Sequence, residues 1–311
     1  MKEYPLVTIG VASYNNAAYI TETLSSVYHQ RYPNLEIMVV DDRSTDGSPA
    51  VIEAWIGTHQ NRRVSLEVNQ ENSGIVGVAN KLLSRASGKY FILFGSDDVM
   101  LEHHVEELVD QFESLEKEGK LPAFIYTPVF LINGQGERLP AGEGSIPSSR
   151  KVHFFENGYA QVLLGKVKIP APGVMVRTSA LKPAGYDPRY FQEDFPLWLR
   201  LSKNNPYGYY ESPNVQYRIH SGSLMATKKA RLLQNKIGIL LDELERMDEG
   251  AGQPLKRLLI GKIRDKCFEL LRYDAAASAR LLREVNRRTF SPKSYLYSLL
   301  IRAGLVRFVK G

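Results

Sequence analysis

The sequence predicts an α/β fold in which a mostly parallel sheet is flanked by helices, followed by an α-helical C-terminal extension. Strand-like and helix-like segments alternate over residues 1–100, which favours parallel strands joined by right-handed crossovers. Residues 90–94 are apolar on both faces, as expected of a strand buried inside a parallel sheet. Polar residues follow several of these strands.

Four strands and three helices are predicted in the first hundred residues. The strands are short apolar runs at residues 6–12, 35–40, 64–68 and 90–94. The helices are predicted because apolar residues recur at the spacing of one helix face. These faces comprise Ile20, Leu24, Val27 and Tyr28, then Val51, Ile52, Trp55 and Ile56, and then Val78, Leu82, Leu83 and Ala86. This is the organisation of a nucleotide-binding half-domain.

Beyond residue 100 the predicted elements are less regular. Helices are expected at residues 102–118, 155–164 and 192–201, strands at 124–132 and 174–177, and a strand or loop at 217–220. Asn133-Gly134 is a hairpin signal, and residues 135–150 are rich in Gly, Pro and Ser, which is typical of a mobile surface loop. We predict one domain over residues 1–225, with halves 1–100 and 101–225, and a helical basic region over 226–311, broken near residues 250–254, 273–274 and 292.

Composition is that of an ordinary globular chain. Of the 311 residues, 43% are hydrophobic and 24% are charged. The single cysteine, Cys267, forms no internal disulfide, which fits a reducing compartment. The start has no signal-peptide core and the chain has no apolar run long enough to span a bilayer, so the expected location is cytoplasmic.

Charge is unevenly distributed along the chain. The net charge is +6, yet residues 227–311 alone contain 19 Lys/Arg and 9 Asp/Glu. Apolar residues between 295 and 309 are interleaved with Lys293, Arg302 and Arg307, as in a basic amphipathic helix that makes a peripheral contact with an anionic membrane. The alternative is a helix docked on its own domain, and a homodimer or partner contact also stays open.

Two carboxylates, Asp97 and Asp98, follow the buried strand at residues 90–94. Ligands bind at the carboxyl ends of strands in open α/β sheets. Neighbouring carboxylates repel each other there unless a cation or hydrogen-bond donors lie between them. Mn²⁺ or Mg²⁺ bridging to phosphate oxygens satisfies this requirement. The alternative is a polar turn in which Asp98 caps the following helix.

Three predicted strands end in polar residues at the same edge of the sheet. These ends are Ser13-Tyr14-Asn15, Asp41-Asp42 and Ser96-Asp97-Asp98. Tyr14 has a ring that can stack on a base, and Asp42 can accept hydrogen bonds from a uracil or ribose donor. For Asp41 and Asp42 the alternative is capping of the next turn.

These motifs together resemble family 2 glycosyltransferases. The resemblance rests on 11–16 (Val-Ala-Ser-Tyr-Asn-Asn), 30–37, 39–48 (with Asp41-Asp42), Asn72-Ser73-Gly74 with Asn80, and Gly95-Ser96-Asp97-Asp98, and it spans roughly residues 5–225. It implies a GT-A fold, Rossmann-like, with a nucleotide-sugar half and an acceptor half. It also implies inverting transfer from a nucleotide diphosphate sugar, usually with Mn²⁺ or Mg²⁺.

The resemblance implies roles for individual residues in the first half. Ser13 and Tyr14, beside Ala12 and Asn15, would line the base pocket, and Asp42 or Asp41 would pair with uracil. Asn72, Gly74 and Asn80 would lie near the nucleotide. Asp97, next to Ser96, would face the ribose, and Asp98 would ligate the metal. Ala12 replaces a common proline and Ala79 a common arginine, which leaves the donor nucleotide open.

In the second half, Asp194 matches the family's catalytic carboxylate. It would take the proton of the acceptor hydroxyl, and adjacent Glu193 is the rival base. The alternative has Asp194 capping a helix and Trp198 simply in the core. His220 would be a further metal or diphosphate ligand, and Arg218 would neutralise phosphate charge.

The leading hypothesis is a glycosyltransferase of cell-surface polysaccharide or lipopolysaccharide biosynthesis. The family resemblance implies a UDP-sugar as the donor and a saccharide or a lipid-linked sugar as the acceptor. A sugar nucleotidyltransferase would need a Gly-rich loop with a basic residue after the first strand, and residues 10–14 offer neither. A nucleic-acid binder would use the basic tail, but interleaved acids such as Asp242 and Glu245 interrupt a phosphate track. No nucleic-acid partner is therefore expected.

Overall fold

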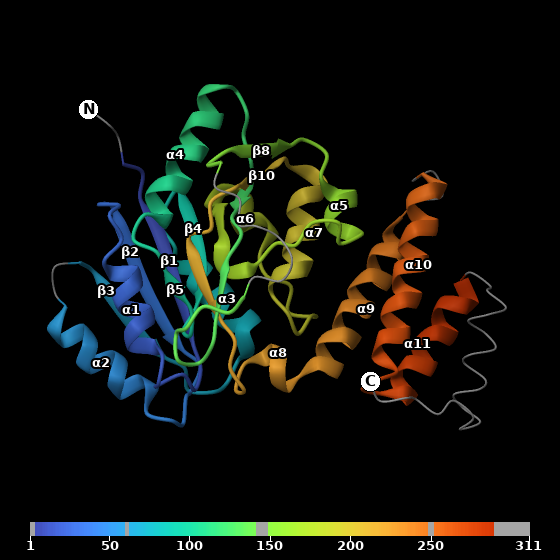
Figure 1. Cartoon of the computed structure of the whole chain (residues 1–311), viewed down its shortest axis with the longest axis horizontal. Helices are drawn as coiled ribbons and strands as arrows, with labels where there is room; N and C mark the ends of the chain where they lie inside the picture. Colours follow the sequence, from blue (N-terminus) through green and yellow to red (C-terminus); the bar gives the residue numbers. More distant parts are fainter. Residues whose placement is uncertain (1–3, 60–61, 141–148, 248–251, 289–311) are drawn as a thin grey trace. The chain divides into compact units, whose positions relative to one another are not determined.

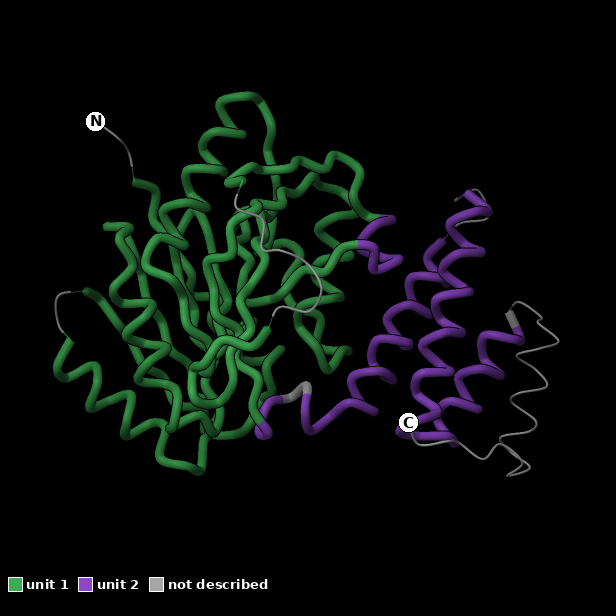
Figure 2. The backbone as a smooth tube through the Cα atoms, in the orientation of Figure 1, with its two compact units in different colours: residues 1–159, 167–220 green, residues 160–166, 221–311 purple. Residues whose placement is uncertain are grey.

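The structure is a computed structural model that describes residues 4–59, 62–140, 149–247 and 252–288. It divides into two compact units (Figure 2), one formed by residues 1–159 and 167–220 and the other by residues 160–166 and 221–311. The predicted boundary at residue 225 stays a prediction. The predicted amphipathic tail at residues 295–309 lies outside the described residues, as do residues 141–148, which are half of the predicted surface loop.

The first unit is built on an eight-stranded sheet in the order β3-β2-β1-β4-β9-β6-β10-β8 (Figure 1). Its strands are β1 Val7–Ser13, β2 Leu35–Asp41, β3 Val64–Val68, β4 Tyr90–Gly95, β6 Phe124–Tyr126, β8 Val152–Phe155, β9 Val174–Arg177 and β10 Tyr207–Tyr210. The pairs among β1 to β4 are all parallel, whereas β9 runs antiparallel to β4 and β6. This confirms the predicted mostly parallel α/β sheet.

Helices cover both faces of this sheet. They are α1 Ile20–Tyr28, α2 Ser48–Thr58, α3 Gly74–Arg85, α4 His104–Lys117, α6 Thr178–Ala184 and α7 Asp194–Asn204. Helix α5, Tyr159–Leu163, follows β8 in the chain, and all but its first residue belong to the second unit. The buried faces of α1, α2 and α4 pack with Val7, Ile9 and Val11 in one apolar core. On the other face, a Cβ at Gly10 would lie 3.1 Å from Leu82 Cδ1 of α3, so the glycine allows α3 to pack closely.

A three-stranded sheet, β5-β11-β7, lies beside the carboxyl end of β4. It pairs β5 Val99–Met100 and β7 Phe130–Ile132 with β11 Val215–Arg218. The Asn133-Gly134 turn is present, but the strand after it forms only the single bridge Ile132↔Arg138. The helix predicted from residue 155 is wrong at its start, because Phe155 ends β8 and the helix begins at Tyr159.

The second unit is helical, as predicted for the C-terminal extension. It contains α8 Leu224–Thr227, α9 Lys229–Arg246, α10 Gln253–Leu270 and α11 Ala275–Arg288. Cys267 is buried and unpaired with another cysteine. Among the described residues, no helix combines the length and apolarity needed to cross a membrane.

Candidate active site

Strand register brings the three predicted polar ends to one edge of the sheet. Ser13 at the end of β1 is opposite Asp41 of β2, and Ala12 is opposite Gly95 of β4. Side-chain hydrogen bonds then join the loops that follow. Ser13 Oγ donates to Asp41 Oδ2 at 2.8 Å, and Asn16 Nδ2 donates to Ser96 Oγ at 2.8 Å. The three ends therefore form one continuous rim.

Tyr14 is the aromatic side chain that this rim presents outward. It is 50% exposed, whereas its neighbour Ser13 is buried. Asn15 adopts a left-handed backbone conformation with φ 52°, and its Oδ1 accepts the backbone N–H of Thr45 at 2.8 Å. Locking Asn15 into this turn leaves the Tyr14 ring open to a planar ligand, which is the geometry that base stacking requires.

Asp42 makes its hydrogen bonds within the protein. Its Oδ1 accepts the backbone N–H of Ser73 at 2.8 Å, and its Oδ2 accepts that of Gly74 at 2.7 Å. Asn72 Nδ2 donates to the Asp42 carbonyl at 3.1 Å. These contacts are those of a carboxylate that caps the start of α3, and not of the turn directly after Asp42 that the sequence offered as the alternative. Asp41 similarly accepts the N–H and hydroxyl of Ser44. Pairing of either carboxylate with uracil stays a prediction.

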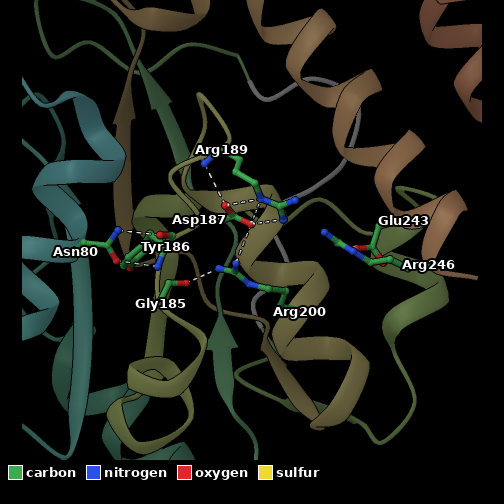
Figure 3. A network of polar contacts seen from close by, with 8 residues as sticks. All are labelled: Asn80, Gly185, Tyr186, Asp187, Arg189, Arg200, Glu243 and Arg246. Carbon is green, nitrogen blue, oxygen red and sulfur yellow. Dashed lines mark hydrogen bonds and ion pairs between the residues drawn. The ribbon is translucent and has the colours of Figure 1, made fainter. Parts of the chain in front are cut away.

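Asn80 links α3 to the segment that leads to the predicted base. Its amide donates to the Tyr186 carbonyl at 2.8 Å and accepts the Tyr186 N–H at 2.9 Å (Figure 3). The next residue, Asp187, pairs with Arg189 at 2.7 Å and with Arg200 of α7 at 3.4 Å. This network anchors the start of the segment that leads to Glu193 and Asp194. The predicted position of Asn80 near the nucleotide stays a prediction.

Asp97 and Asp98 converge over Gly95. A Cβ placed on that glycine would lie 2.9 Å from Oδ1 of Asp97 and 3.2 Å from Oδ2 of Asp98. Asp98 is 3% exposed, and burial together with the Asp97 charge raises its pKa well above the ordinary value. Two carboxylates directed at one point from a buried turn favour a bound cation over mutual repulsion. These residues therefore fit a hard divalent metal.

His220 lies beside this carboxylate pair. Its Nε2 is 3.1 Å from Asp97 Oδ2. Within the described part of the chain, however, no group of three His, Cys, Asp or Glu side chains is placed to hold a metal ion. The predicted trio of Asp97, Asp98 and His220 is thus not a complete protein cage. Two carboxylates completed by substrate phosphates suit Mg²⁺ or Mn²⁺.

Glu193 and Asp194 stand at the start of α7. Asp194 Oδ1 accepts the backbone N–H of Phe195 at 2.6 Å, so it contributes to capping, and Trp198 is buried against Phe124. Burial, with the adjacent Asp194 charge, raises the pKa of Glu193 to about 8. Near neutral pH, Glu193 is therefore protonated and cannot take a further proton, which leaves Asp194 as the candidate base.

Tyr217 connects the two acidic pairs and was missed by sequence reasoning. Burial raises the pKa of its phenol, and four carboxylates raise it further. They are Asp98, Asp97, Asp194 and Glu193, in decreasing order of effect. The charges of the predicted metal ligands and of the predicted bases thus both act on the pKa of this phenol. The available signal was strand alternation, which sets Tyr217 on the opposite face from Arg218.

The raised pKa of Glu193 predicts a pH-dependent stability. An acid raised from 4.5 to about 8 stabilises the fold fully below pH 4.5 and loses this contribution as pH rises through 8. We expect Glu193→Gln to melt at a higher temperature than the unsubstituted protein at pH 9, by about 2–4 °C for each kcal/mol of penalty removed. The gap should shrink at pH 6.

The control is Glu71→Gln at an exposed site, which should leave the pH dependence of melting unchanged. Parallel melting curves for Glu193→Gln and Glu71→Gln between pH 6 and 9 would show that Glu193 is an ordinary solvated acid.

The fold is of the GT-A type, and comparisons with known proteins agree. Residues 8–142 match glycosyl transferase family 2. This part of the chain is therefore similar to that family, and the protein is a glycosyltransferase.

Three similar proteins illustrate the likeness. The UDP-Glc:alpha-D-GlcNAc-diphosphoundecaprenol beta-1,3-glucosyltransferase WfgD of Escherichia coli is 26% identical, over 79% of this chain and 88% of its own. The fold resembles S. aureus TarS 1-349 in complex with UDP-GlcNAc, with TM-score 0.60, 16% identity, and coverage of 97% of this chain and 93% of that one. It also resembles the mannosyltransferase PcManGT from Pyrobaculum calidifontis in complex with GDP-Man and Mn²⁺, with TM-score 0.56, 17% identity, and coverage of 97% and 87%.

Proposed function

We propose that this protein is an inverting, metal-dependent glycosyltransferase that moves a sugar from a UDP-sugar to a saccharide or lipid-linked acceptor in cell-surface polysaccharide or lipopolysaccharide synthesis. The observation that carries the proposal is the convergence of Asp97 and Asp98 over Gly95, at the sheet edge where β1 and β2 also end in polar residues; Glu193 and Asp194 supply the second acidic pair at the start of α7. One pair suits a cation and the other suits a base. Inverting transfer needs both functions within one site.

Each residue then has a defined task. Tyr14 stacks on the base, and Asp98 with Asp97 holds Mn²⁺ or Mg²⁺. A cation held by these two residues would supply charge neutralisation at the departing diphosphate. Asp194 takes the proton of the acceptor hydroxyl as its oxygen bonds to the anomeric carbon. The bond between the anomeric carbon and the diphosphate oxygen breaks on the opposite face of the sugar, and its electron pair leaves with the diphosphate. This displacement inverts the configuration of the anomeric carbon.

The relatives support the choice of substrates. WfgD is named for a UDP-glucose donor and a diphosphoundecaprenol acceptor, and the TarS complex contains UDP-GlcNAc. The GDP-Man complex of PcManGT shows that the same fold accommodates another nucleotide. Since Ala12 and Ala79 depart from the common family pattern, the donor must be measured.

A thermal-shift panel of UDP-glucose, UDP-GlcNAc and GDP-mannose, with and without Mn²⁺, tests the proposal. A ligand at 100 times its Kd adds about 2.7 kcal/mol to the free energy of unfolding, or roughly 5–10 °C for a domain of this size. We expect this shift for a UDP-sugar with Mn²⁺ and a much smaller one without it. A panel with no shift at all, or one indifferent to metal, would contradict the proposal.

A further inference from the structure

Arg218 of β11 is almost completely removed from solvent. It is 2% exposed and is the largest of the fully buried side chains. A guanidinium keeps its charge when buried, so it must be matched by hydrogen-bond acceptors. The groups that accept hydrogen bonds from the Arg218 guanidinium therefore indicate its role.

On one side, Arg218 holds both residues of the Asp97–Asp98 turn. Its Nε donates to the Asp97 carbonyl at 2.7 Å, and its backbone N–H donates to Asp98 Oδ1 at 2.9 Å. One residue thus fixes the main chain of the first aspartate and the carboxylate of the second. The remaining oxygen of Asp98 is the one directed over Gly95.

On the other side, the guanidinium is tied to α1 and to the turn after β7. Its Nη2 donates to Glu22 Oε2 at 2.6 Å, and its Nη1 donates to the carbonyls of Asn133 at 3.2 Å and Gly134 at 3.4 Å. All three guanidinium nitrogens therefore have acceptors within the protein. Little donor capacity is left for a substrate phosphate.

Tyr19 extends the same cluster to His220. The Arg218 guanidinium lies 4.8 Å from the centre of the Tyr19 ring, and the His220 ring lies 4.8 Å from it at an angle of 56°. His220 in turn contacts Asp97 at 3.1 Å. The cluster thus closes around the carboxylate pair from two directions.

We infer that Arg218 is a positioning residue, which with Glu22 and Tyr19 sets the geometry of Asp97, Asp98 and His220 for the metal, and that it does not bind the donor phosphates. This inference rests on the proposed function. It replaces the phosphate-neutralising role that the family resemblance implied for Arg218. Side chains that orient metal ligands typically contribute 10–100-fold to metal affinity or activity.

The test compares Arg218→Lys and Glu22→Gln with Arg177→Lys. Arg177 is a matched control because its side chain is 13% exposed and ion-paired to Glu116, and it pairs with Tyr90 at the far end of β4. Mn²⁺ affinity is measured by electron paramagnetic resonance at saturating UDP. UDP affinity without metal is measured by calorimetry, and melting temperature reports folding.

We expect Arg218→Lys to weaken Mn²⁺ binding about 10–100-fold and leave metal-free UDP affinity unchanged. Glu22→Gln is a milder variant, because the Glu22 side chain is 54% exposed. It is expected to weaken Mn²⁺ binding about threefold, and it tests the inference if Arg218→Lys does not fold. Arg177→Lys should leave Mn²⁺ affinity unchanged.

Two outcomes would overturn the inference. One is an unchanged Mn²⁺ affinity in both folded variants. The other is a loss of metal-free UDP affinity in Arg218→Lys, which would indicate direct phosphate contact. Failure of the unsubstituted protein to bind any nucleotide with Mn²⁺ is a separate result, and it would reject the proposed function itself.

Discussion

The Asp194→Asn variant is expected to lose about 10²–10⁴-fold in kcat while binding its donor as tightly as the unsubstituted enzyme, because a positioned general base contributes rate enhancement of this size. Asparagine keeps the shape of the side chain and an oxygen that can accept the Phe195 N–H, a contact of 2.6 Å. The helix start should therefore survive. Only the capacity to take a proton is removed.

Glu193→Gln distinguishes the two candidate bases. Because its pKa is raised to about 8, Glu193 already carries a proton at neutral pH, and the amide should change kcat far less than Asp194→Asn. Steady-state rates and calorimetric UDP affinities for both variants decide the assignment. Normal turnover by Asp194→Asn with a collapse in Glu193→Gln would exchange their roles.

The Asp98→Asn variant is expected to lose metal-dependent donor binding by at least about 100-fold, since it removes a direct ligand rather than an orienting partner. Its fold should be at least as stable as that of the unsubstituted protein. Asparagine can still accept the Arg218 N–H at the position of Asp98 Oδ1. Burial and the Asp97 charge raise the pKa of Asp98, which means that its ionised form destabilises the fold, and asparagine removes this cost.

Calorimetry with UDP and Mn²⁺, beside melting curves, measures both expectations. The control is Asp110→Asn at an exposed position of α4, which should retain full affinity. Unchanged UDP–Mn²⁺ affinity in Asp98→Asn would remove this residue from the metal site.

The first hundred residues were predictable because their signals are local. The strand at Val64–Val68 has the predicted bounds, and the predicted face of α1 is buried. The second half was harder. β5, β8 and β10 are only 2, 4 and 4 residues long, too short for periodicity to show, and their pairing partners are distant in sequence.

The residue types at the site were predictable, but not the direction of each side chain. Pairing of Asp42 with a base stays a prediction, but the contact of its carboxylate with the start of α3 could not be foreseen. The phosphate-neutralising role expected of Arg218 also stays a prediction, but its burial and its contacts with the Asp97 carbonyl and Glu22 could not be foreseen. Both outcomes depend on long-range packing, and capping and ligand-binding carboxylates look alike in sequence. Tyr217 gave no signal of its own, because a tyrosine in a strand usually packs.

Anomalous diffraction at the manganese edge, on crystals grown with UDP and Mn²⁺, tests the central claim most directly. We expect one manganese peak over Gly95, within about 2.0–2.3 Å of a carboxylate oxygen of Asp98, with diphosphate oxygens completing its coordination and Asp194 facing the same space. A peak bound to other residues, or UDP bound with no manganese at this turn, would contradict it.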